Sequence, residues 1–165
     1  MTRSVLADEV EVRRLVSIYA SYVDDGDHAR MGGLFAPGGR LVVYHQGGRP
    51  RVDEPLRQWE GEGFSRLIAA LGKSYVRWAH MVGNHWALFD GDRAHGETYC
   101  LAMHLRDGDP QSEEVNLIRY WDDYVFTADG WRFAARHAVK QWGVIRPVNA
   151  GLHELDALLH GRPGA

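Results

Sequence analysis

The sequence predicts an α+β fold in which helices come first and a strongly curved sheet follows. Residues 8–23 repeat their apolar side chains at the spacing of one helix face. From residue 75 onward the pattern changes to long alternating stretches separated by glycine-containing turns. Helices followed by a run of antiparallel strands are typical of α+β domains. We therefore expect a cone-shaped α+β barrel, whose mixed or antiparallel sheet wraps around the N-terminal helices and an internal pocket.

The elements before residue 75 are predicted from local patterns. The helix over residues 8–23 is expected to end near Gly26, because glycine readily adopts the left-handed conformation of a C-terminal cap. The other elements predicted here are a short helix over 28–35, a strand over 40–44, a turn at 45–48 and a helix over 64–72.

Four long strands are predicted in the second half of the chain, over residues 75–89, 93–106, 113–126 and 131–142. They exceed the usual strand length of about five or six residues, so they must bend strongly. Interior glycines such as Gly83 and Gly96 permit bulges and bends. A last helical piece is expected over 150–160. We expect a single domain over residues 1–165, with a C-terminal extension from about residue 145.

The composition excludes several classes of protein. The net charge is −3, and no run of Lys and Arg suggests a nucleic-acid surface. Cys100 is the single cysteine, which excludes an internal disulfide and fits a reducing compartment. Neither a signal peptide nor a membrane-spanning stretch is apparent in the sequence. These features predict a cytoplasmic protein that binds neither nucleic acid nor membrane.

His80 is the first candidate for chemistry. Alternation along its strand places it between Trp78 and Val82 on an apolar face, where an unpaired imidazole is costly. Asp24, at the end of the first helix, is a candidate partner that would fix the tautomer of His80 and raise its basicity. The alternative for Asp24 is a turn residue at the helix end. Beyond Gly83, a bulge would reverse the two faces of the strand.

Other chemistries are less well supported by the sequence. His104 ends a face of small residues that either lines a cavity or packs under a helix. Cys100 lies in an apolar strand and fits a core position better than a nucleophile. The histidines lack metal-ligand spacing, since alternation puts His80 and His85 on opposite faces. We expect neither a metal nor a cofactor.

Three segments carry a resemblance to a known family: IYASYVDDGDHARMGGLFAP, AHMVGNHWALFDGDRAHGETY and DGWRFAARH. They resemble the SnoaL-like branch of the nuclear transport factor 2-like superfamily, and the resemblance spans roughly residues 8–145. In motif, the chain is most similar to the scytalone dehydratases and the bile-acid 7α-dehydratases.

The resemblance implies roles for individual residues. Asp24 and His80 match an acid–base pair, and His104 matches a second histidine that would protonate a departing hydroxide. Tyr44 approximately matches one of two tyrosines that act on the substrate carbonyl, and Tyr19 or Tyr22 would take the place of the other. The implied substrate-binding residues are Tyr22, Phe35, Phe64, Trp78, Asn84, Trp86, Asn116 and Tyr120.

The implied function is that of a cofactor-independent lyase. As a dehydratase, the protein would abstract a proton next to a carbonyl of a cyclic, polyketide- or steroid-like small molecule. An isomerase or cyclase that uses the same pair is one alternative, and a non-catalytic ligand-binding module is another. A small subunit that supports a separate oxygenase is a further alternative, although it gives Asp24 and His80 no shared task. The superfamily also implies a homodimer or homotrimer formed through the outer face of the sheet.

Overall fold

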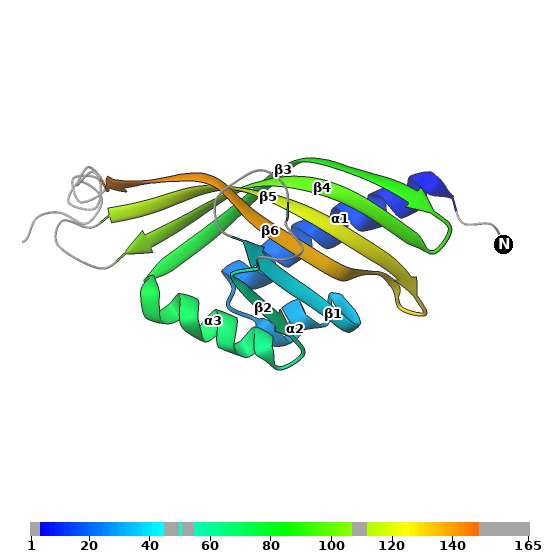
Figure 1. Ribbon diagram of the computed structural model, residues 1–165, viewed down its shortest axis with the longest axis horizontal. Helices are drawn as coiled ribbons and strands as arrows, with labels where there is room; N and C mark the ends of the chain where they lie inside the picture. The colour runs from blue at the N-terminus through cyan, green and yellow to red at the C-terminus, as the bar shows by residue number, and fades with distance from the viewer. Residues whose placement is uncertain (1–3, 45–49, 51–54, 107–111, 149–165) are drawn as a thin grey trace, which may run out of the picture.

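The computed structural model describes residues 4–44, 50, 55–106 and 112–148 (Figure 1). Within these residues the chain forms three helices and six strands. In order, they are α1 (Val5–Asp24), α2 (His28–Gly32), β1 (Phe35–Tyr44), β2 (Arg57–Glu60), α3 (Gly63–Ser74), β3 (Arg77–Asp90), β4 (Arg93–Arg106), β5 (Ser112–Thr127) and β6 (Gly130–Pro147). In this described part, no helix combines the length and apolarity that crossing a membrane requires.

The six strands form one curved sheet in the order β2-β1-β6-β5-β4-β3, and its two edges do not meet (Figure 1). β1 and β6 are parallel, and the other neighbouring pairs are antiparallel. The predicted α+β fold, with a mixed, strongly curved sheet around the helices, is confirmed. Because β3 to β6 follow one another in sequence, short turns join most of the sheet.

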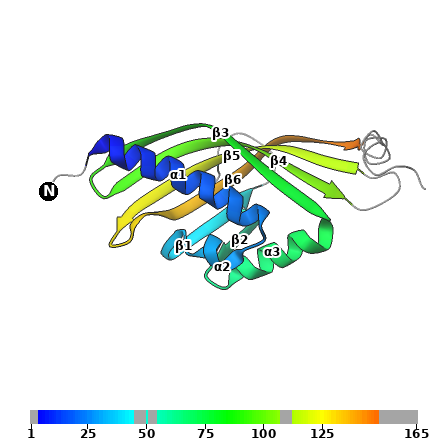
Figure 2. The same cartoon turned by 180° about the vertical axis from the view of Figure 1, so that it is seen from behind.

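Helix α1 packs against one face of the sheet, which we call the inner face (Figure 2). The helix contacts β3 and β6. Its buried apolar stripe matches the sequence pattern and consists of Val12, Leu15, Val16, Tyr19 and Val23. Together with inward-facing residues of the strands, this stripe forms the main core. The opposite face of the sheet is called the outer face below.

A bulge in β3 reverses the direction of its side chains. Gly83 pairs with Tyr99 of β4, but the next paired residue of β3 is Trp86, opposite Glu97. Asn84, inside the bulge, has a φ of 46°, a backbone conformation that asparagine tolerates better than most residues. Beyond the bulge Trp86 therefore points to the outer face, where it is 46% exposed.

Several predicted elements differ from the structure. The short helix ends at Gly32 rather than residue 35, and β1 begins at Phe35, five residues early, with a register irregularity before Arg40. β2 was not predicted, because four residues are too few to show alternation. β6 continues to Pro147, past residue 145, where the C-terminal extension was expected to begin. The predicted turn at 45–48 and helix at 150–160 lie outside the described residues.

Candidate active site

Asp24 and His80 form the pair that the sequence suggested. Nδ1 of His80 lies 2.7 Å from Oδ1 of Asp24, and the backbone N–H of His80 donates to Oδ2 at 3.0 Å. An ionised carboxylate only accepts hydrogen bonds, so Nδ1 carries the ring proton and Nε2 has its lone pair free. The His80 side chain is 9% exposed and that of Asp24 is 29% exposed. The geometry is that of a histidine base oriented by a carboxylate.

The end of α1 is held on β3 by a tryptophan. Nε1 of Trp78 donates to the backbone oxygen of Val23 at 2.7 Å, one residue before Asp24 and two strand positions from His80. The indole N–H thus attaches the end of the helix to the strand, and this contact helps to hold the Asp24 carboxylate beside Nδ1 of His80. A hollow of about 190 Å³, lined by Asp24, Val76, Arg77 and Trp78, opens beside this contact.

His104 lies next to His80 on the inner face. The two rings are 5.7 Å apart and nearly perpendicular, because His104 pairs with Trp78 and so sits diagonally from His80. Tyr75 stacks on the His104 ring at 4.5 Å. Nδ1 of His104 is buried and has no hydrogen-bond partner among the described residues. Burial, and then the neighbouring His80, lowers the pKa of His104 from 6.5 to about 4.

A polar cluster adjoins His104. Glu114 accepts hydrogen bonds from Tyr75 at 3.1 Å, from Asn116 at 3.2 Å and from Arg106. Burial would raise the pKa of Glu114, but these donors hold it at about 2. The hydrogen bond from Nδ2 to Glu114 fixes the orientation of the Asn116 amide. Its buried Oδ1 has no partner in the described part of the chain. Gly143 leaves the space for this amide, since a Cβ there would collide with Oδ1.

Arg136 is a functional candidate that the sequence offered only alongside Arg119 and Arg132, as possible contacts of an anionic substrate, with a solvated arginine as the commoner interpretation. Its guanidinium is fully buried and binds Asp122 through two bonds of 2.8 Å. The rings of Tyr19, Tyr120 and Phe133 surround it at 4.1–4.3 Å. Its Nη1 is buried without a partner among the described residues. Arg136 lies among the apolar residues of β6, which is the only hint of burial in the sequence. That hint does not distinguish a buried arginine from a solvated one.

The remaining predicted inner-face residues are aromatic and buried to different degrees. Tyr19 is 4% exposed, and burial raises its pKa to about 12, so it is a neutral phenol. Tyr120 packs edge-on against Tyr19 with ring centres 6.2 Å apart. Phe35 and Phe64 stack at 4.7 Å inside the core. Tyr22 is half-buried, with the Arg30 guanidinium 4.8 Å above its ring.

Tyr44 does not join the site. Leu41 and Val43 of β1 belong to the main core, so alternation turns Tyr44 to the outer face. There its hydroxyl is hydrogen-bonded to Nδ1 of His137 at 3.0 Å. The expectation that Tyr44 contacts the carbonyl of a substrate beside His80 is wrong for this geometry. Trp86 and Asn84, displaced by the bulge, likewise do not line the inner face.

The structure thus places the Asp24–His80 pair, His104, Asn116 and Arg136 on the inner face of the sheet. His80 and Asn116 lie close in register, because both pair with Ala102. Arg136 pairs with Asp122, six residues further along β5 than Asn116. Burial raises the pKa of Cys100 to about 11, as expected of a core thiol. Among the described residues, no group of three or more His, Cys, Asp or Glu side chains is arranged to hold a metal.

Comparisons with known proteins find relatives in sequence and in fold. An uncharacterized protein of Mycobacterium tuberculosis is 30% identical over 135 residues, which are 82% of this chain and 86% of that protein. The structure is similar to that of a hexachlorocyclohexane dehydrochlorinase, with a TM-score of 0.71 and 17% identity over 87% of this chain and 90% of that one.

A second structural neighbour is a protein from Novosphingobium aromaticivorans provisionally named scytalone dehydratase. It has a TM-score of 0.67 and 16% identity over 84% of this chain and 87% of that one. At these identities, the structural similarity concerns the fold. The sequence pattern of the SnoaL-like domain matches residues 4–137, and the chain therefore belongs to the SnoaL-like domain family.

Proposed function

We propose that this protein is a cofactor-independent lyase, a dehydratase that removes a proton next to a carbonyl group and expels water. One observation carries the proposal: both carboxylate oxygens of Asp24 hold His80, one at the ring and one at the backbone. A carboxylate so placed fixes the basic nitrogen of the ring and stabilises the imidazolium once His80 has taken a proton. A purely structural helix-end aspartate has no need of both contacts.

In the proposed reaction, Nε2 of His80 takes the proton from the carbon next to the carbonyl. The electron pair of that C–H bond moves toward the carbonyl and forms an enolate. Nη1 of Arg136 and the neutral hydroxyl of Tyr19 are the donors offered to the enolate oxygen, in place of Tyr44. The buried positive charge of Arg136 is fixed in advance, and such donors stabilise charge that develops in a transition state.

The departing hydroxyl is assigned to the other side of His80. Because the pKa of His104 is about 4, this ring is neutral near pH 7 and acts as a hydrogen-bonding group rather than a cationic acid. His104 and Asn116 would hold the hydroxyl while the carbon–oxygen bond breaks. The proton that completes the water molecule then comes from the His80 imidazolium.

The proposed substrate is a cyclic, polyketide- or steroid-like small molecule. Trp78 supports this class, since it lines a hollow of about 410 Å³ together with His104, and flat rings pack well against aromatic side chains. The neutral state of His104 favours a second candidate, an isomerase or cyclase. In those reactions His80 returns its proton to carbon, and no hydroxide has to be protonated.

The experiment uses deuterium exchange in D₂O. A panel of cyclic β-hydroxyketones is incubated with the protein, and NMR follows loss of the proton next to the carbonyl together with formation of the double bond. Exchange with loss of water identifies a dehydratase, and exchange with a shifted double bond identifies an isomerase. His80→Ala and Asp24→Asn should each slow exchange by about 100-fold or more.

Matched controls are available on the same surface. Asp25 is the exposed neighbour of Asp24, and His28 is exposed in α2, so Asp25→Asn and His28→Ala should retain wild-type rates. If His80→Ala exchanged these compounds as fast as the wild type, the proposed base would be wrong. If the wild-type protein bound them without any exchange, the protein would be a ligand-binding module.

We also propose that the chain acts in the cytoplasm as one domain, residues 1–165, assembled as a homodimer or homotrimer. The outer face supports the assembly with a row of register partners across four strands: Met81, Leu101, Leu117 and Trp142. Met81 is 64% and Trp142 50% exposed. The next row, Ala79, Met103, Val115 and Val144, is also apolar. A continuous apolar surface of this kind is typical of an interface between subunits.

A further inference from the structure

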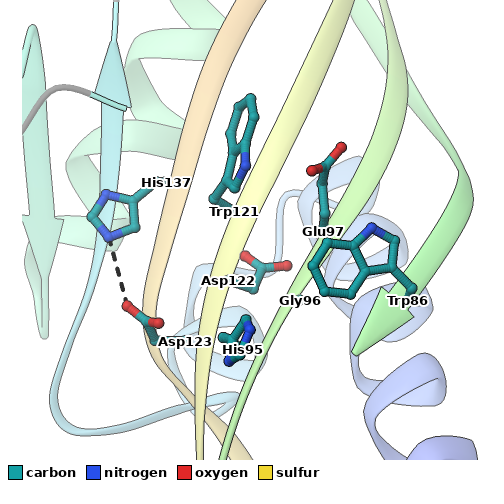
Figure 3. A pocket seen from close by; sticks show the side chains of 8 residues that line it. All are labelled: Trp86, His95, Gly96, Glu97, Trp121, Asp122, Asp123 and His137. Carbon is teal, nitrogen blue, oxygen red and sulfur yellow. Dashed lines mark ion pairs between the residues drawn. The ribbon is translucent and has the colours of Figure 1, made fainter. Parts of the chain in front are cut away.

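A second hollow lies on the outer face of the sheet, away from His80 (Figure 3). Its volume is about 360 Å³, within the range of small-molecule sites. It is lined by Trp86, His95, Gly96, Glu97, Trp121, Asp122, Asp123 and His137. Of these residues, Asp122 also holds Arg136 of the proposed lyase site. The others take no part in the proposed proton abstraction, so a ligand bound by Trp86, Trp121 and Asp123 does not depend on the proposed lyase activity.

Strand register builds the walls of the hollow. Trp86, Glu97, Trp121 and His137 are successive register partners across β3, β4, β5 and β6. The bulge after Gly83 is what turns Trp86 toward this face. Gly96 permits the close strand contact at the bulge, since a Cβ there would lie 2.5 Å from the backbone oxygen of Trp86. Figure 3 shows the Trp86 and Trp121 indoles on either side of Glu97.

One carboxylate of the hollow is exposed. Asp122 is bound by Arg136 through two bonds, and Glu97 is bound by Arg119 at 2.8 Å. Asp123 has a side chain that is 62% exposed, and its contact to Nε2 of His137 is 4.0 Å long. Burial lowers the pKa of His137, so that ring does not neutralise Asp123 near pH 7. Asp123 therefore presents a negative charge to the hollow, while Arg40 and Arg93 line an adjoining hollow that Asp123 shares.

The aromatic walls are suited to a positive charge. Indole rings attract cations placed over their faces more strongly than other aromatic side chains do. Trp121 already makes this interaction, because the Arg119 guanidinium lies 4.7 Å from its ring centre. Trp86 is held edge-on to His95, with ring centres 6.2 Å apart, and is half exposed. Both rings thus flank a space that Asp123 makes negative.

We propose that this hollow binds a small organic cation of the alkylammonium class, held between Trp86 and Trp121 and balanced by Asp123. A metal ion fits less well, because the described residues form no group of three suitable ligands. An anion would face the Asp123 carboxylate. An alkylammonium ion can make both interactions: its positive charge and alkyl groups contact the indole rings, and its charge is balanced by the Asp123 carboxylate.

The probe for the test is choline, and its control is 3,3-dimethylbutan-1-ol, which has the same shape without the charge. Calorimetric titration of the whole protein at pH 8 should show saturable choline binding in the low-millimolar range or tighter, and much weaker binding of the alcohol. Trp86→Leu and Asp123→Asn should each weaken choline binding about fivefold or more. Both side chains are substantially exposed, so the variants are expected to fold.

Leu88→Ala is the matched control, because Leu88 is 58% exposed on the same strand as Trp86 but does not line the hollow. Choline binding should be unchanged in Leu88→Ala and in His80→Ala. Equal affinity for the neutral alcohol, or an equal loss in Leu88→Ala, would overturn the proposal. The proposal would also be overturned if choline bound only to a Met81→Glu variant that is monomeric. That result would mean that a second copy of the chain covers the hollow in the wild-type protein.

Discussion

Asp24 shows how much a single side chain contributes when two contacts converge on it. Its carboxylate sets the tautomer of His80 through Nδ1 and fixes the strand position of His80 through the backbone N–H. An asparagine in its place would offer one acceptor oxygen and one donor nitrogen, so it could accept only one of the two hydrogen bonds that His80 donates, and it would carry no charge. The charge is what stabilises a protonated imidazole, which is the property that the proposed proton transfer requires of Asp24.

His104 gives the fold an acid-sensitive position. Its folded pKa, about 4, lies below its ordinary 6.5, so the unfolded chain takes up a proton first as the pH falls. The stability that neutral His104 contributes is full above pH 6.5 and is lost progressively toward about pH 4. Between pH 6.5 and about pH 5.5 the loss should be about 1 kcal/mol.

This prediction is checked by urea unfolding across that pH range. A His104→Gln variant should lose less stability on acidification than the wild type. The exposed His28→Gln variant should follow the wild-type curve. Glu114 does not obscure the result, because its pKa is lowered from 4.5 to about 2 and its contribution is lost only below about pH 4.5. Identical pH profiles for His104→Gln and the wild type would contradict a neutral, buried His104.

At the scale of elements, the join between α1 and β3 decides where the site lies. The helix ends at Asp24, and the Trp78–Val23 hydrogen bond docks that end on the strand. The sequence predicted both elements, because apolar spacing is a local property of each. It did not predict the contact, since an indole N–H and a helix-end carbonyl carry no pattern that pairs them.

Trp78→Phe is therefore expected to lower the free energy of unfolding by about 1 kcal/mol, the usual net value of one hydrogen bond. It should also reduce any exchange activity more than the loss of stability alone would suggest, because Asp24 loses its fixed position over His80. Urea unfolding and the deuterium-exchange assay measure the two effects. Trp142→Phe, on the exposed outer face, is the control and should change stability by less than about 0.5 kcal/mol. Equal behaviour of the two variants would argue against the docking contact.

The β3 bulge explains the errors in residue placement. Alternation holds only while every residue is paired. The bulge adds one residue to β3, so that two residues stand opposite one residue of β4, and Asn84 and Trp86 therefore do not point to the face that alternation predicts. Tyr44 was misplaced for a related reason, because a strand of unknown neighbours does not reveal which of its two faces is the inner one. His80 and His104 lie on unbroken stretches, and alternation correctly put each on a face with small or apolar neighbours.

At the scale of the whole molecule, the curved sheet separates two kinds of surface. Its inner face, covered by α1, carries the acid–base pair and the buried Asp122–Arg136 ion pair. Its outer face carries the apolar rows and the tryptophan-lined hollow. Removing one partner of a buried ion pair lowers protein stability far more than removing one partner of an exposed pair. Arg136 therefore contributes to the stability of the inner face.

Assembly through the outer face is tested with Met81→Glu. A carboxylate in the apolar row should weaken self-association at least about tenfold while leaving the inner core intact. Light scattering over a concentration series measures the mass. Val10→Glu is the control, because Val10 is 61% exposed on α1, on the other side of the sheet. A wild-type protein that is monomeric throughout the series would refute the assembly.

The sequence by itself determined the helices, the long strands and the α+β class, since each follows from the spacing of apolar residues along a short stretch. It also singled out His80, because an imidazole on an apolar face demands a partner. Only the tertiary structure decided that the partner is Asp24, that Arg136 is buried, and that Tyr44 and Trp86 face outward. Those outcomes depend on bulges, register and the docking of α1, which arise between segments distant in the chain and leave no local pattern.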